Sequence, residues 1–119
     1  MALIEGEVLL PPDAHSFSDA TLIVELQDTR EADVPARILA RHIQPGISYD
    51  PMRPKPVHFS VILGDSASAP GVTVSVLLDL DGDGHITRGD YINVESYPVT
   101  ADSAPLRVRV HRVTGVAPA

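Results

Sequence analysis

The feature that most constrains this chain is a period-two alternation of apolar and polar side chains, which recurs along most of its length. In the clearest segment, Leu106, Val108 and Val110 alternate with two arginines and a histidine. Successive side chains of a strand point to opposite faces, so this pattern is typical of half-buried β-strands. We expect strands at 4–10, 20–28, 57–63, 72–78, 91–97 and 106–111.

The segment 35–44 also alternates, although its Ala and Leu content would equally suit a short helix. We predict a strand, because its neighbours are strands, and we expect Pro45 and Gly46 to end it. Residues 47–56, with three prolines, are expected to form an extended loop, and 64–71 a turn region.

About seven strands with turns at this spacing predict an all-β fold, a single β-sandwich of immunoglobulin or transthyretin type. We expect one domain over 1–114 and a flexible tail over 115–119, because the chain is the length of one ordinary domain.

The chain has 9 basic and 16 acidic residues, a net charge of -7, and no cysteine. The acidic balance argues against a nucleic-acid partner, which needs clustered Lys and Arg. Membrane insertion is not expected, since no apolar run approaches about 18 residues. Met1 is not followed by a signal peptide, so we expect a cytoplasmic protein as the chain stands, or a periplasmic or extracellular one if a leader was removed.

One acidic stretch of twelve residues matches the calcium-binding loop of EF-hands. Calcium prefers six to eight oxygen ligands, and this loop type supplies them at alternate positions. Asp79, Asp81 and Asp83 occupy positions 1, 3 and 5, and Asp90 closes the loop at position 12. These aspartates are the predicted metal ligands.

The residues between these aspartates also fit the loop pattern. Gly84 stands at position 6, where the chain must turn sharply, and His85 at position 7 would offer its backbone carbonyl. Thr87 at position 9 would contribute through its hydroxyl or a water. We expect Ile86 to anchor the loop to the protein body. The predicted cofactor is therefore Ca²⁺.

Two departures from an EF-hand change this prediction. Asp90 is shorter than the usual Glu, so calcium should bind more weakly and Mg²⁺ becomes an alternative. The flanking segments read as strands rather than helices, so we expect the ion to act as a structural staple and not as a calcium switch. The competing interpretation is a plain hairpin turn, for which Asp-Gly pairs are also favoured.

No other motif predicts catalysis, and we therefore expect no enzymatic activity. No nucleophile elbow surrounds a serine and no phosphate-binding loop opens a helix. Three arginines near the end form a basic strip that we expect to be solvated or paired with acids. None of the five histidines has metal-ligand spacing with another, and we expect surface imidazoles: His15, His42, His58, His85 and His111.

Three short motifs carry a family resemblance: a strand ending in proline at Gly6 to Pro11, a second strand ending at Asp28, and an Ala-Asp-Val-Pro-Ala turn at 32–36. The chain resembles the YbaY/YscW-type lipoprotein family over most of residues 6–113. This resemblance implies a small β-sandwich. Some members are outer-membrane lipoproteins that act as pilotins, the chaperones of type III secretion secretins. This chain has no cysteine to lipidate and carries the EF-hand-like loop in addition.

The main functional hypothesis is a non-enzymatic, calcium-stabilised β-sandwich module that binds a protein partner, for example by strand addition at a sheet edge. An exported, pilotin-like secretion chaperone is the first alternative. A transthyretin-like hydrolase is the second, although the Tyr-Arg-Gly-Ser ending of hydroxyisourate hydrolases is missing here.

Overall fold

The computed structural model describes residues 2–28, 37–63, 71–82, 84–86, 88–94, 97–99 and 105–113. Within these ranges the chain forms strands and turns, and no helix there is long and apolar enough to cross a membrane. The predicted all-β class is confirmed, whereas the expected tail at 115–119 lies outside the described residues.

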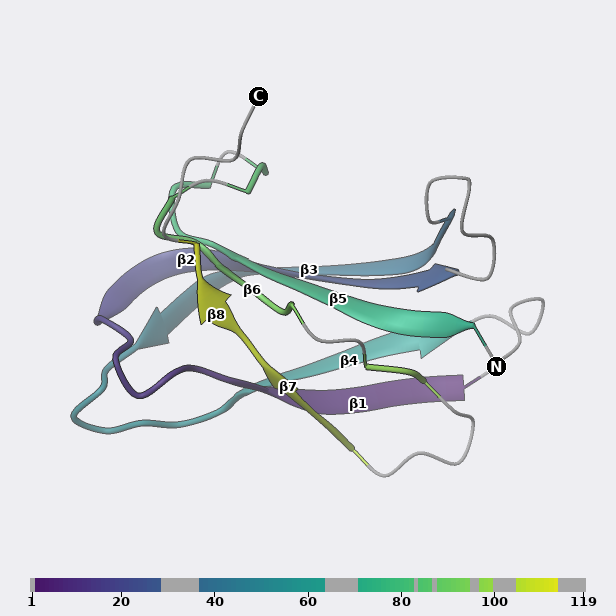
Figure 1. Cartoon of the computed structure of the whole chain (residues 1–119), viewed down its shortest axis with the longest axis horizontal. Helices are drawn as coiled ribbons and strands as arrows, with labels where there is room; N and C mark the ends of the chain where they lie inside the picture. Colours follow the sequence, from purple (N-terminus) through teal and green to yellow (C-terminus); the bar gives the residue numbers. More distant parts are fainter. Residues whose placement is uncertain are drawn as a thin grey trace.

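In the described part of the chain, eight strands stack as two sheets, one of three strands in the order β4-β1-β7 and one of five in the order β3-β2-β5-β6-β8 (Figure 1). Neighbouring strands are antiparallel, except that β1 and β7 run parallel. The strands are β1 (Ala2–Leu9), β2 (Phe17–Asp28), β3 (Arg37–Tyr49), β4 (Val57–Leu63), β5 (Val72–Asp79), β6 (Tyr91–Ile92), β7 (Leu106–Arg109) and β8 (His111–Arg112).

Alternate side chains of both sheets meet in one hydrophobic core, as the period-two pattern predicted. The central strands β2 and β5 contribute most, because every second residue is buried from Ala20 to Leu26 in β2 and along β5. Burial of this apolar surface is the main favourable term in folding. The largest fully buried apolar side chains in the described ranges are Val8, Leu22, Val24, Leu26, Val72, Val76, Leu78, Tyr91, Val99, Val108 and Val110.

A close approach inside the three-stranded sheet requires a glycine at position 6. Gly6 faces Phe59 across the β1–β4 pair. A Cβ at Gly6 would lie 2.5 Å from Cζ of Phe59 and 2.8 Å from the carbonyl oxygen of Leu106. The aromatic ring therefore fills the space that a side chain at position 6 would occupy.

Strand β3 is longer than expected, because Pro45 and Gly46 do not end it and residues 47–49 are strand rather than loop. The register of the β2–β3 pair shifts between Ala20 and Leu22, opposite these two residues. Gly46 has a φ of 74°, which only glycine adopts readily. Pro45 and Gly46 thus form a β-bulge inside β3, whereas we had predicted that they end the strand.

The last predicted strand divides between the two sheets. Strand β7 pairs with β1 in the smaller sheet, whereas β8 pairs with β6 in the larger one. Val110 lies between them, buried, and its N–H donates to the carbonyl of Leu9 at 3.1 Å. Figure 1 shows this segment crossing from one layer to the other. Period-two alternation continues through the crossing, so the sequence pattern did not reveal it.

Strand β6 ends at Ile92, five residues before the predicted end at 97. The side chain of Asn93 takes over the pairing: its Oδ1 accepts from the N–H of Val76 at 2.7 Å, and its Nδ2 donates to the carbonyl of Val74 at 3.1 Å. A side-chain amide thus replaces backbone ladder bonds at this point.

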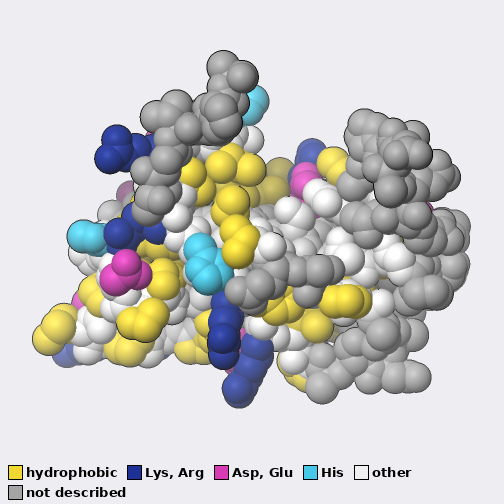
Figure 2. All heavy atoms as spheres, viewed as in Figure 1, with side chains coloured by type: hydrophobic (Ala, Val, Ile, Leu, Met, Phe, Trp, Pro, Cys, Tyr) yellow, Lys and Arg dark blue, Asp and Glu magenta, His cyan; other side chains and the backbone are white. Residues whose placement is uncertain are grey.

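The predicted basic strip is only partly present. Arg107 and Arg109 are exposed on β7, and Figure 2 shows basic side chains projecting from this part of the molecule. Arg112 instead lies 5.9 Å from the centroid of the Tyr91 ring and donates to the carbonyl of Asp13. The change of sheet at Val110 separates it from the other two arginines.

Candidate metal centre

The acidic loop connects two paired strands, as expected from the sequence. Asp79 is the last residue of β5, and Asp90 immediately precedes β6. Leu78 and Tyr91 are register partners, so the ends of the loop are held side by side. Both aspartates are only 1% exposed, which is unusual for carboxylates.

Three of the predicted ligands converge. Asp79, Asp81 and Asp90 each offer a carboxylate oxygen, and these oxygens lie within 4.8 Å of one another. Asp81 is exposed, so the cluster opens to solvent on its side. His85 is described and exposed, whereas Asp83 lies outside the described residues. Thr87, the candidate at position 9, also lies outside them.

The side chain of Asp79 organises the first half of the loop. Its Oδ1 accepts from the N–H of Gly82 at 3.1 Å, and its Oδ2 accepts from the N–H of Gly84 at 2.6 Å. Gly82 and Gly84 have φ values of 73° and 76°, so both sharp bends favour glycine. Through these two hydrogen bonds the side chain of Asp79 holds the loop in a tight turn, which places Asp81 close to Asp79.

Asp90 fixes the second half of the loop. Its Oδ1 accepts from the N–H of Leu80 at 2.9 Å, which joins the end of the loop to its beginning. The carbonyl of Asp90 accepts from the N–H of Val113 at 2.8 Å, and the N–H of Gly89 donates to the carbonyl of Val113 at 2.9 Å. The segment after β8 therefore clamps the closing aspartate.

The electrostatics of the cluster are unfavourable for charge on Asp79. Burial raises the pKa of Asp79, and the hydrogen bond with Asp81 and repulsion from Asp90 raise it further. The N–H groups of Gly84 and Gly82 oppose this rise in pKa. A divalent cation among these oxygens would favour the charged carboxylate instead.

A buried aromatic side chain directly follows the closing aspartate of the loop. Tyr91 is buried and packs against Phe17 with tilted rings, at 6.0 Å between ring centroids. Its phenol oxygen accepts from the N–H of His15 at 3.3 Å. From the sequence we predicted only that Tyr91 begins a strand. The position of this aromatic residue directly after the closing aspartate was the only sequence signal for its place beside the loop.

Ile86, which we expected to anchor the loop to the protein body, lies at the surface and not in the buried core. Its side chain is 58% exposed and lines a surface groove of about 410 Å³ on the outer face of the larger sheet. Ile23 and Leu77 line the same groove. The loop is held instead by the hydrogen bonds of Asp79 and Asp90.

These two sheets define the chain as a β-sandwich. No protein-family model matches the chain, and no curated protein matches its sequence. The fold is similar to the solved structure of an alternative pilotin from the type II secretion system of Vibrio cholerae, with a TM-score of 0.62. The two proteins are 22% identical, and the match covers 92% of this chain and 96% of that chain.

This likeness shows a shared fold. The pilotin-like β-sandwich implied by the family resemblance is thereby confirmed, whereas the comparisons give no support for the YbaY/YscW family itself. The structural neighbour comes from a type II secretion system, and the resemblance had implied type III.

Proposed function

We propose that this chain is a non-enzymatic, protein-binding accessory protein of the pilotin type. The observation that carries this proposal is the similarity of fold to a pilotin along nearly the full length of both chains. A match of this extent covers the whole sandwich rather than one shared hairpin. It favours the secretion-chaperone alternative over an unspecified binding module.

The exposed sheet edges support a protein partner. Among the described strands, β4 ends one sheet and β3 ends the other, so each has one side without a neighbouring strand. Free backbone groups on such edges are natural docking points for a further strand. A pilotin-type role also implies export from the cytoplasm.

We also propose that the loop at 79–90 binds Ca²⁺, with Mg²⁺ as the competing ion. Support comes from the converging carboxylate oxygens of Asp79, Asp81 and Asp90, two of which are buried. The ion would join the ends of β5 and β6, and through Asp90 also the segment at Val113. Its role would be structural, because binding to the folded state alone adds stability by mass action.

Deletion of the gene in its host tests the pilotin-type function. We expect fewer assembled secretin multimers in the outer membrane, measured by immunoblotting after mild solubilisation. A plasmid copy should restore the multimers, and a copy carrying Asp19→Asn, an exposed site outside the loop, should restore them equally. Unchanged multimers in the deletion strain would refute the proposal.

A further inference from the structure

A short loop at one end of the sandwich carries the most exposed large hydrophobic side chain among the described residues. The loop joins β3 to β4 over residues 50–56 and protrudes from the end of the molecule (Figure 1). Met52 lies in this loop and is 86% exposed. A single exposed apolar residue is common in proteins, so the groups around Met52 decide whether it has a function.

The backbone around Met52 is fixed in a turn. The N–H of Arg53 donates to the carbonyl of Asp50 at 3.0 Å, and the N–H of Met52 donates to Oδ1 of Asp50 at 2.9 Å. Asp followed by Pro is a favoured start for such a turn. Prolines at 51, 54 and 56 restrict the backbone further. Little conformational entropy is therefore lost when this tip docks on a surface.

Positive charge lies next to Met52 in the same loop. Arg53 follows Met52 directly, Lys55 lies two residues further, and both are exposed. In the part of the chain that the structure describes, neither forms an ion pair with an acid. The loop therefore presents an apolar side chain and two cations that are available to a partner.

Strand β7 adds two further cations beside the loop. Leu9 lines a small cavity of about 160 Å³ together with Lys55, and it is the register partner of Arg109 on β7. Leu9 thus lies between the base of the loop and Arg109. Arg107 and Arg109 alternate with the buried Val108, so both point to the outer face of the smaller sheet. We call the following five residues the basic surface: Met52, Arg53, Lys55, Arg107 and Arg109.

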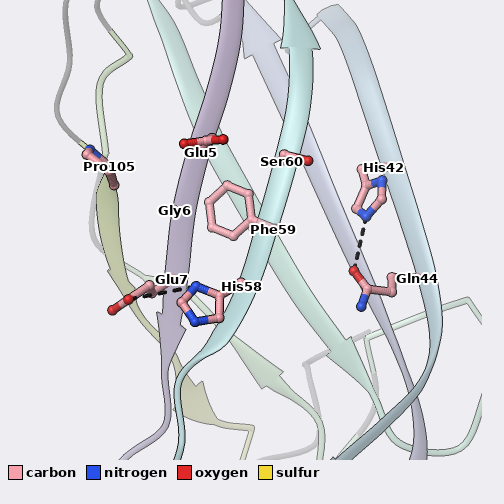
Figure 3. Close-up of a pocket in the computed structure, with 9 residues that line it drawn as sticks. All are labelled: Glu5, Gly6, Glu7, His42, Gln44, His58, Phe59, Ser60 and Pro105. Atoms are coloured by element: carbon pink, nitrogen blue, oxygen red, sulfur yellow. Dashed lines mark hydrogen bonds and ion pairs between the residues drawn. The ribbon is translucent and has the colours of Figure 1, made fainter.

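The acids near the basic surface do not cancel its charge. Glu7 lies beside it on β1, and Figure 3 shows Glu7 directed toward His58, at 3.8 Å between Oε1 and Nδ1. Asp13 lies 4.0 Å from Arg112, with which it pairs. Four basic side chains against Glu7 and Asp50 leave this surface positive, on a chain whose net charge is -7. More distant acids are screened, because the Debye length is about 8 Å at physiological ionic strength.

We propose that the basic surface docks this chain on an anionic lipid bilayer, with Met52 inserted among the headgroups and Arg53 and Lys55 at the lipid phosphates. Anionic headgroups attract the cations, and the boundary with the acyl chains takes up the apolar side chain. A bilayer accepts a protruding tip of any detailed shape, whereas an acidic protein would need a pocket matched to Met52, which favours the bilayer. This contact is peripheral, requires no membrane-spanning segment, and goes beyond the proposed protein-binding function.

Co-sedimentation of the full chain with lipid vesicles tests the proposal. We expect binding to phosphatidylglycerol vesicles at low ionic strength, loss of binding in high salt, and no binding to phosphatidylcholine vesicles. Each Lys or Arg near an anionic surface strengthens binding about fivefold, so Lys55→Gln should bind about fivefold more weakly. The matched variant Arg37→Gln removes an exposed positive charge at the far end of β3 and should bind like the wild type.

Two variants of Met52 separate insertion from simple charge attraction. Met52→Ser leaves the charge unchanged and should weaken binding to phosphatidylglycerol vesicles about tenfold, whereas Met52→Leu should bind like the wild type. Equal binding of the wild type and Met52→Ser, or of the wild type and Lys55→Gln, would overturn the proposal. Binding of a capped hexaglutamate peptide without binding to vesicles would also overturn it, in favour of an acidic protein partner.

Discussion

The substitution Asp81→Asn should change stability in opposite directions with and without calcium. Asp81 is exposed, and its carboxylate oxygen lies within 4.8 Å of those of Asp79 and Asp90. Asparagine keeps the shape of the side chain and can still donate a hydrogen bond, but removes the charge. The variant therefore isolates the electrostatic contribution of one of the proposed ligands.

In chelator-treated protein the variant should be more stable. Two like charges about 4 Å apart repel by about 1 kcal/mol in a water-like dielectric, and salt reduces this. Asp81 faces two such neighbours, so a gain of about 1 kcal/mol in the free energy of unfolding is expected after screening. In saturating calcium the variant lacks one charged ligand, and a tenfold loss of affinity would remove about 1.4 kcal/mol of binding stabilisation. Together with the gain of about 1 kcal/mol in the calcium-free protein, this leaves the variant about 0.4 kcal/mol less stable than the wild type in calcium.

Urea denaturation of both proteins, in chelator and in millimolar calcium, measures the two changes. Asp50→Asn, an exposed acid outside the loop that can keep its hydrogen bond to the N–H of Met52, is the control and should show neither change. An effect of the same sign in both solutions would refute the metal-site reasoning, because the loop would then be only a turn.

Three further predictions concern the scaffold and the cluster. Gly6→Ala should lower the free energy of unfolding by about 1–3 kcal/mol, because its Cβ would meet Phe59 and the backbone of Leu106; urea denaturation measures this. In chelator, stability should fall as pH rises above 3.8 through the raised pKa of Asp79, since the native state there holds a proton that the unfolded state has lost; thermal melts should show this slope flattening in saturating calcium. Tyr91→Phe should cost about 1 kcal/mol by removing the acceptor for the N–H of His15, a loss that thermal melts in chelator should show.

Much of the candidate site was predictable from the sequence. Ligand spacing in this loop type is local, so Asp79, Asp81 and Asp90 could be named without knowledge of the fold. Their hydrogen bonds to Leu80 and Gly84 are also local. The clamp at Val113 was not predictable, because it extends the β6–β8 pairing, which joins residues that are distant along the chain. The exposure of Ile86 likewise depended on which groups anchor the loop in three dimensions.

The sequence by itself determined the all-β class, the core-facing residues and the acidic loop, because period-two alternation and ligand spacing act over a few neighbouring residues. Tertiary structure decided which strands pair. Only the fold could show that β7 and β8 belong to different sheets. The alternation of apolar and polar residues does not indicate which strand is the partner. Only the fold brings Leu3 and Ala40 to one cavity, since packing of the two sheets joins residues that are distant along the chain.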